Sequence, residues 1–226
     1  MKQFFRQNAI FISLSVLLIL VMGVLLVSIP QKDLHLLLNS YHTPALDVFF
    51  KYYTKIAEFV IYLVAAGLLF YKVGDALFVL SGELGIGLIV QIIKRIVCAP
   101  RPAAVFDIKN NPDILPLVDG VRMHFANSFP SGHTATFVTL FFIVSIFCCR
   151  SNRLKPWAKG CIQVVCFLAA FVGAYSRIYL SQHFLADICV GACLSIVCVP
   201  LLYYGFECLR AKHPRFYDWN VLKINS

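Results

Sequence analysis

The sequence contains few charged residues for its length. Only 14% of its 226 residues are charged, whereas about a quarter of the residues in an average soluble domain carry a charge. It also has no CxxC pair, no Cys/His spacing typical of a zinc site, no repeated motif and no low-complexity stretch. These absences argue against a soluble domain, a zinc-stabilised fold and a repeat protein.

Hydrophobic residues instead make up 60% of the chain, and they are gathered in long runs. A helix needs roughly 17–20 such residues to cross the hydrocarbon core of a membrane. We therefore predict an all-α, polytopic membrane protein, a six-transmembrane-helix bundle that forms a single domain over residues 1–226. The expected helices cover about Ala9–Ile29, Phe59–Tyr71, Ala76–Ile93, Thr134–Cys149, Gly160–Ala174 and Ile188–Phe206.

The first run is interpreted as a retained helix, because it is long for a signal peptide and no small-residue cleavage site follows it. An even number of spans puts both termini on one side. The positive-inside rule assigns that side, which has the basic loop 150–159 and the basic tail after Arg210, to the cytoplasm. We expect a protein of the cytoplasmic (inner) membrane. The candidate site, which is formed by the three polar segments described below, is expected on the outer, periplasmic face.

The nine cysteines and the net charge of +9 do not change this interpretation. Eight of the cysteines lie in or beside apolar runs, where free cysteine behaves as a small buried hydrophobe. Three cations belong to the candidate site, and many others lie in short loops, where they set the topology or meet anionic headgroups. The expected partners are therefore membrane lipids, with no nucleic acid and no obligate protein partner.

Three polar segments, residues 94–102, 130–133 and 176–187, interrupt the apolar background. In the last of them His183 and Asp187 are four residues apart, so on a helix they lie on one face. A carboxylate on one imidazole nitrogen fixes the tautomer and leaves the other nitrogen free to attack. Because ionisable residues at the end of a membrane helix are usually functional, we expect a catalytic pair.

The second segment, Pro130-Ser131-Gly132-His133, comes directly before an apolar run. A helix that begins there offers unpaired N–H groups and a positive dipole end to a phosphate. Gly132 lets the backbone approach the anion closely. His133 can then protonate the departing oxygen as a general acid.

Three cations, Lys94, Arg101 and Arg177, complete the candidate site. Arginine binds phosphate oxygens as a bidentate fork and lysine binds them as a point charge. Together they hold the charge that spreads over the equatorial oxygens in the transition state of phosphoryl transfer. This set of residues moves a phosphoryl group without a metal or a cofactor, and in so apolar a chain we expect the phosphate to be carried by a lipid.

The combined pattern K-x6-RP, PSGH and SR-x5-H-x3-D resembles the type 2 phosphatidic acid phosphatase (PAP2) superfamily of membrane lipid phosphatases. Every position is matched, by Lys94, Arg101, Pro102, Pro130, Ser131, Gly132, His133, Ser176, Arg177, His183 and Asp187. The resemblance implies that His183 is the nucleophile, Asp187 its orienting partner and His133 the acid for the leaving group. It also implies a metal-independent reaction through a phosphohistidine, with a phosphate cradle of Lys94, Arg101, Ser131, Gly132 and Arg177.

The expected function is hydrolysis of a phosphate monoester or diphosphate of a membrane lipid. The sequence leaves open whether that lipid is a lipid A-type glycolipid, an isoprenyl (undecaprenyl) diphosphate, phosphatidylglycerol phosphate or phosphatidic acid. The alternatives are a lipid phosphotransferase with the same intermediate and a non-catalytic lipid transporter or binding protein. The last is disfavoured, because transport needs phosphate ligands but no pair of nucleophile and acid.

Two other features bear on the site. The long connection from about Lys94 to Phe129 is expected to cap it. Glu83 lies inside the third apolar run, where a carboxylate is a functional candidate, but the small residues around it favour a structural bond to a neighbouring helix. His124 is a minor candidate for headgroup contact, and His35 is expected to be solvated.

Overall fold

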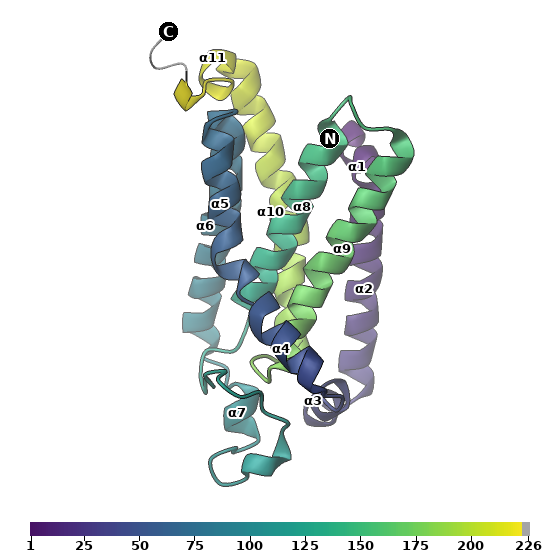
Figure 1. The fold of residues 1–226 in the computed structure, drawn as a ribbon, viewed down its shortest axis with the longest axis vertical. Helices are drawn as coiled ribbons and strands as arrows, with labels where there is room; N and C mark the ends of the chain where they lie inside the picture. The colour runs from purple at the N-terminus through teal and green to yellow at the C-terminus, as the bar shows by residue number, and fades with distance from the viewer. Residues whose placement is uncertain (223–226) are drawn as a thin grey trace.

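The computed structural model describes residues 1–222 and is built from helices, with no β-strand among those residues (Figure 1). In chain order these are α1 (Lys2–Gln7), α2 (Ala9–Ser28), α3 (Gln31–Leu38), α4 (Pro44–Tyr53), α5 (Ile56–Leu69), α6 (Val73–Val97), α7 (Pro102–Val105), the 3-10 helix η1 (Pro112–Ile114), α8 (Gly132–Arg150), α9 (Pro156–Tyr179), α10 (Leu185–Lys212) and α11 (Pro214–Tyr217). The all-α prediction is confirmed. The single-domain prediction extends to residue 226, and its last four residues lie outside the described part of the chain.

Five helices are long and apolar enough to cross a membrane, namely α2, α6, α8, α9 and α10. The 14 residues of α5 rise only about 21 Å, which is short of the roughly 30 Å of a hydrocarbon core. Helices α4 and α5 qualify as a pair, bent by 44° at the break between them. The second of the six predicted spans is therefore too short to cross alone and belongs to this bent helix pair.

Two spans continue further toward the candidate site than the sequence predicts. Helix α6 passes the expected end at Ile93, and α9 passes the expected end at Ala174. Lys94 and Arg177 consequently lie in the last turns of these helices, where the negative end of the helix dipole stabilises a cation. The hydropathy pattern ends early because a charged side chain interrupts the apolar run while the backbone stays helical.

The two ends of the bundle carry different features. In Figure 1, α1, the α8–α9 connection and α11 lie at one end, whereas α3, α4 and α7 lie toward the other. Both ends of the described chain are thus on one side, as an even number of spans requires. That side carries the basic residues Arg150, Arg153, Lys155, Lys159, Arg210, Lys212 and Arg215.

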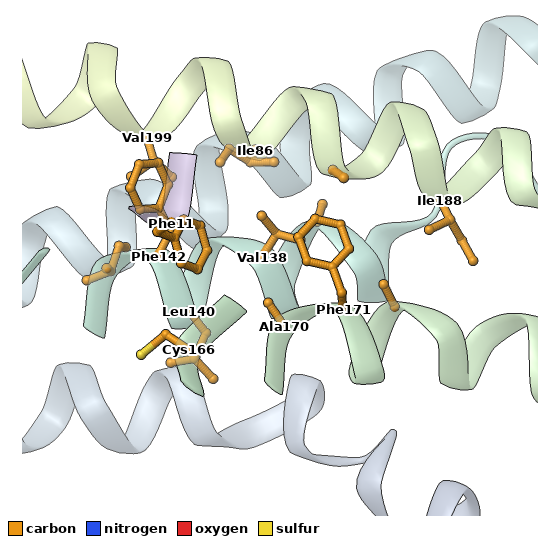
Figure 2. Close-up of a cluster of buried hydrophobic side chains, with 14 of the residues drawn as sticks. Phe11, Ile86, Val138, Leu140, Phe142, Cys166, Ala170, Phe171, Ile188 and Val199 are labelled. Carbon is orange, nitrogen blue, oxygen red and sulfur yellow. The ribbon is translucent and has the colours of Figure 1, made fainter. Parts of the chain in front are cut away.

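Helix α8 lies at the centre of the bundle and contacts α6, α9 and α10. Figure 2 shows Val138 and Phe142 of α8 among apolar side chains from the surrounding helices. The ring of Phe142 stacks on Phe11 of α2, with 4.7 Å between the ring centroids. Because lipid tails are as apolar as these side chains, close packing holds the spans together more than burial from water does.

The connection between α6 and α8 covers the end of the bundle at which α7 lies. Phe106 and Leu115 of this connection pack against Phe184, which precedes α10. The backbone N–H of Ser128 donates to the Ala99 carbonyl at 2.9 Å, which joins the two ends of the connection. The path of the connection agrees with the predicted capping role. Contact between His124 and lipid headgroups stays a prediction.

The expectation that His35 is solvated is wrong. Its side chain is buried, because the rings of Phe106 and Phe184 lie 5.6 and 5.2 Å from the imidazole, centroid to centroid. Neither ring nitrogen has a hydrogen-bond partner among the described residues. Burial lowers the pKa of His35 to about 4, so the ring is neutral near pH 7 and packs as an aromatic side chain.

Glycine at position 173 allows α9 to lie against the ring of Phe137 on α8, because an added Cβ would overlap that ring. We expect Gly173→Ala to lower the thermal unfolding midpoint, since overpacking costs about 1–3 kcal/mol. Gly23→Ala in α2 is the matched control, because nothing lies within 4 Å of its added Cβ. Alanine is the better helix former by about 1 kcal/mol, so the control midpoint should hold or rise. Equal shifts in both variants would contradict the close packing of α8 on α9.

Candidate active site

A cavity of about 420 Å³ collects residues from all three polar segments of the sequence. Its lining includes Lys94, Arg101, Gly132, His133, Arg177 and His183. Ser131 and Asp187, the other two predicted site residues, are buried next to lining residues: Ser131 precedes Gly132, and Asp187 contacts His183. The tertiary structure therefore brings the whole predicted set together, although the first and last members are 93 residues apart.

The predicted pair His183 and Asp187 is in contact, with 3.2 Å between Nδ1 and Oδ2. The expected reason for this contact is wrong, because the two residues do not share a helical face. Helix α10 begins at Leu185, so His183 precedes the helix. Asp187 lies in the first turn, and its Oδ2 accepts the backbone N–H of Phe184 at 3.0 Å. The carboxylate therefore caps the helix and meets the imidazole at the same oxygen.

Electrostatics keep the imidazole of His183 neutral. Burial lowers its pKa well below 6.5, and the nearby charges of Arg177, Arg101 and Lys94 lower it further. With Nδ1 turned toward Asp187, the other ring nitrogen is left to the cavity that His183 lines. A neutral imidazole whose Nδ1–H faces a carboxylate has its lone pair on Nε2, as a nucleophile requires.

Ser128 is a site residue that the sequence analysis missed. Its hydroxyl donates to Oδ2 of Asp187 at 2.5 Å, and its Oγ lies 3.4 Å from Nδ1 of His183. The side chain is fully buried. The available signal was its position two residues before Pro130, because a polar residue beside the predicted phosphate-binding turn is well placed to reach the same centre.

The start of α8 has the predicted form. Ser131 is the residue that caps the helix, and its Oγ accepts the backbone N–H of Thr134 at 3.3 Å. Its own N–H donates to the carbonyl of Asp187 at 3.0 Å, which ties the second segment to the third. Gly191 on α10 permits this approach, because an added Cβ would lie 2.6 Å from the Ser131 carbonyl oxygen. Gly191 has no signal in the sequence that separates it from other helix glycines.

Neutral acceptors hold two buried arginines at the cavity. Arg101 donates from Nε to the Ala126 carbonyl at 2.9 Å and from Nη1 to the Gln182 carbonyl at 3.1 Å. Arg177 donates from Nη1 to Oγ1 of Thr54 at 2.6 Å. Its Nε has no hydrogen-bond partner among the described residues. A buried donor without a partner costs about 1–3 kcal/mol, and an anion in the cavity would remove that cost.

Carboxylates from two other helices also reach the cavity. Oε1 of Glu58 on α5 lies 3.4 Å from Nε2 of His133. Glu83 on α6 accepts a hydrogen bond of 2.9 Å from the hydroxyl of Thr136 on α8, which is the kind of interhelical bond that was expected of it. Both carboxylates line the cavity, and so does the minor candidate His124.

Within residues 1–222, no group of three or more His, Cys, Asp or Glu side chains is arranged to hold a metal ion. That the reaction proceeds without a metal or cofactor stays a prediction, which rests on the chemistry of the residues around the cavity.

The sequence profile of the PAP2 superfamily matches residues 75–210, which is more than half of the chain and includes all three segments. This chain belongs to the PAP2 superfamily. It is therefore a lipid phosphatase by family, which favours an enzyme over the non-catalytic alternative.

Two curated proteins of Porphyromonas gingivalis are similar to this PAP2 chain. The lipid A 4'-phosphatase is 29% identical over 187 residues, which cover 80% of this chain and 75% of that protein. The lipid A 1-phosphatase is 34% identical over 98 residues, which cover 43% of this chain but only 20% of that protein.

Two crystal structures share the fold. LpxE of Aquifex aeolicus is 26% identical, with a TM-score of 0.61 over 76% of this chain and 93% of LpxE. A transmembrane PAP2-type phosphatidylglycerolphosphate phosphatase of Bacillus subtilis has a TM-score of 0.59 over 91% of this chain and 98% of its own, with 19% identity. At that identity the second structure supports the fold alone.

The bond from Ser128 to Asp187 leads to a test of the site. We expect Ser128→Ala to lower the rate of phosphate release by about tenfold or more, because a hydrogen bond to a charged group contributes about 1.5–3 kcal/mol. Ser15→Ala on α2 is the control, since Ser15 is equally buried and its Oγ has no partner within the described chain. A Ser128→Ala enzyme as active as the control would show that Asp187 does not depend on this hydroxyl.

Proposed function

We propose that this protein is a metal-independent phosphatase that removes a phosphate from a lipid A-type glycolipid through a phosphohistidine intermediate. The observation that carries the proposal is the contact between His183 and Asp187 at a cavity that also holds three cations and a second histidine. The choice among lipid phosphates is supported by the two similar curated proteins, both of which are lipid A phosphatases.

In the first step the phosphate binds among Lys94, Arg101 and Arg177, with the N-terminus of α8 beside it. The free nitrogen of His183 attacks phosphorus, and the bond from phosphorus to the lipid oxygen breaks. His133 gives its proton to that oxygen, so the lipid leaves as a neutral alcohol. Asp187 stabilises the positive charge that develops on the ring of the phosphohistidine.

In the second step a water molecule attacks the same phosphorus atom. His133 takes a proton from this water, the bond from phosphorus to nitrogen breaks, and inorganic phosphate is released. His183 then returns to its neutral form. A lipid or sugar hydroxyl in place of water would make the protein a phosphotransferase, and the reaction products distinguish the two outcomes.

We also propose a side of the membrane for the site. The end of the bundle with α1, α11 and the α8–α9 connection carries the basic loop and tail, which the positive-inside rule assigns to the cytoplasm. The cavity would then open on the outer face of the inner membrane.

The mechanism makes a prediction about two substitutions. The purified protein should release phosphate from lipid A in the presence of EDTA, and His183→Ala should release none. Asp187→Asn should lower turnover by about 10⁴-fold while substrate binding persists, as wrong tautomers do in hydrolytic triads. His213→Ala at the opposite end of the bundle is the control and should keep full activity. Activity that EDTA abolishes and added Mg²⁺ or Zn²⁺ restores would contradict the metal-free mechanism.

The orientation can be measured with cysteines. Cys98, which follows α6, is exposed at the end of the bundle that holds the cavity. We expect an impermeant maleimide to label Cys98 in intact spheroplasts. In a Cys98→Ser background, Asn152→Cys in the exposed α8–α9 connection should react only after the membrane is opened. The reverse pattern would place the site in the cytoplasm.

A further inference from the structure

The cavity extends well beyond the phosphate-binding residues. On α6 its lining follows one face of the helix, from Lys94 through Gln91 and Gly87 to Glu83. Glu83 and Lys94 are eleven residues apart, a rise of about 16 Å along the helix. A phosphate held by the cations fills one end only, and the other end reaches into the membrane-spanning part of the bundle.

Polar side chains line this deeper end. Glu83 of α6 and Thr136 of α8 are joined by their hydrogen bond across the cavity wall, and Gln91 lies between Glu83 and the cations. Thr136 occupies one oxygen of Glu83, and the second oxygen, Oε2, has no hydrogen-bond partner among residues 1–222. A carboxylate has about four acceptor sites, so acceptors remain open to a ligand in the cavity.

An occupant of the cavity is indicated independently by Arg177. This side chain is more than nine-tenths buried, it lines the same cavity, and its Nε lacks a partner in the described chain. The unpartnered donor indicates that an anion binds at the end of the cavity that holds the cations. A carboxylate repels that anion, so Glu83 and the cations serve different parts of one ligand.

We infer that Glu83, with Thr136 and Gln91, binds hydroxyl or amide N–H donors of the lipid headgroup and thereby selects glycolipid phosphates. The inference rests on the proposed function and names the feature of the substrate that the site recognises. Phosphatidic acid and isoprenyl diphosphates offer no hydrogen-bond donor beyond the phosphate, whereas the sugar of a glycolipid carries several next to its phosphate ester. A buried acceptor left without its donor penalises the wrong substrate.

The test compares two substrates in the same detergent. For Glu83→Leu we expect kcat/KM on lipid A to fall by about ten- to a hundredfold, the size of one hydrogen bond to a charged group, while kcat/KM on phosphatidic acid and inhibition by vanadate stay unchanged. Glu83→Gln keeps an oxygen for the Thr136 hydroxyl, so it guards against loss of folding and should show a smaller drop in the same direction. Glu207→Gln near the cytoplasmic end of α10 is the matched control and should leave the ratio of the two substrates as it is.

An equal loss on both substrates, or weaker vanadate inhibition, would mean that Glu83 supports the site as a whole and would overturn the inference. No change on either substrate would overturn it as well. If the wild-type protein cleaves neither lipid, the proposed function has failed. The role of Glu83 in headgroup binding is then tested by native mass spectrometry, which measures how much lipid the protein retains. The wild-type protein should then retain dephosphorylated lipid A better than it retains diacylglycerol. If Glu83→Leu showed the same preference as the wild type, the inference would be overturned.

Discussion

The site depends on the satisfaction of one buried carboxylate. Asp187 is 3% exposed, and a charge so far from water must be hydrogen-bonded or paired. Its Oδ2 accepts from the Ser128 hydroxyl and the Phe184 N–H and faces Nδ1 of His183, while its carbonyl accepts the N–H of Ser131. Three of these partners meet the carboxylate, and the fourth, Ser131, meets the backbone carbonyl of Asp187. Because the N–H of Ser128 also donates to the Ala99 carbonyl, the bonds of Asp187 and Ser128 together join all three sequence segments.

The same region holds positive charge that forms no ion pair with the protein's carboxylates within residues 1–222. Within residues 1–222 neither Arg101 nor Arg177 forms an ion pair, and backbone carbonyls and the Thr54 hydroxyl hold them instead. Neutral acceptors fix the direction of a guanidinium and leave its charge for a ligand. Donors and charges oriented before a reaction begins contribute most where water is excluded. The arrangement suits a phosphate that gains charge on its equatorial oxygens, and it explains why His183 is held neutral.

Helix packing supplies the precision that this chemistry needs. In a bilayer the spans associate by close contact, and glycines set how close they come. Gly173 lets α9 approach α8 under Phe137, and Gly191 lets α10 approach the Ser131 carbonyl. The first contact aligns the helix that carries Arg177, and the second brings the helix that carries Asp187 to the turn before α8. A bundle with a wider spacing would keep every side chain and lose the hydrogen bond from Ser131 to Asp187.

The sequence by itself determined the fold class, five of the membrane spans and the residues of the three-part motif, because apolar runs and a dense motif are local signals. It predicted Phe59–Tyr71 as a complete span and did not reveal the bent α4–α5 pair, since an apolar run does not show that its helix is too short to cross alone. It also missed Ser128 and Gly191, and it misjudged why His183 meets Asp187. These features depend on which surfaces face each other after packing: a serine becomes a partner of Asp187, and a glycine becomes necessary, only where two distant segments come within contact distance. For the same reason the role of Glu83 became arguable only when the tertiary structure placed it along the cavity that holds His183.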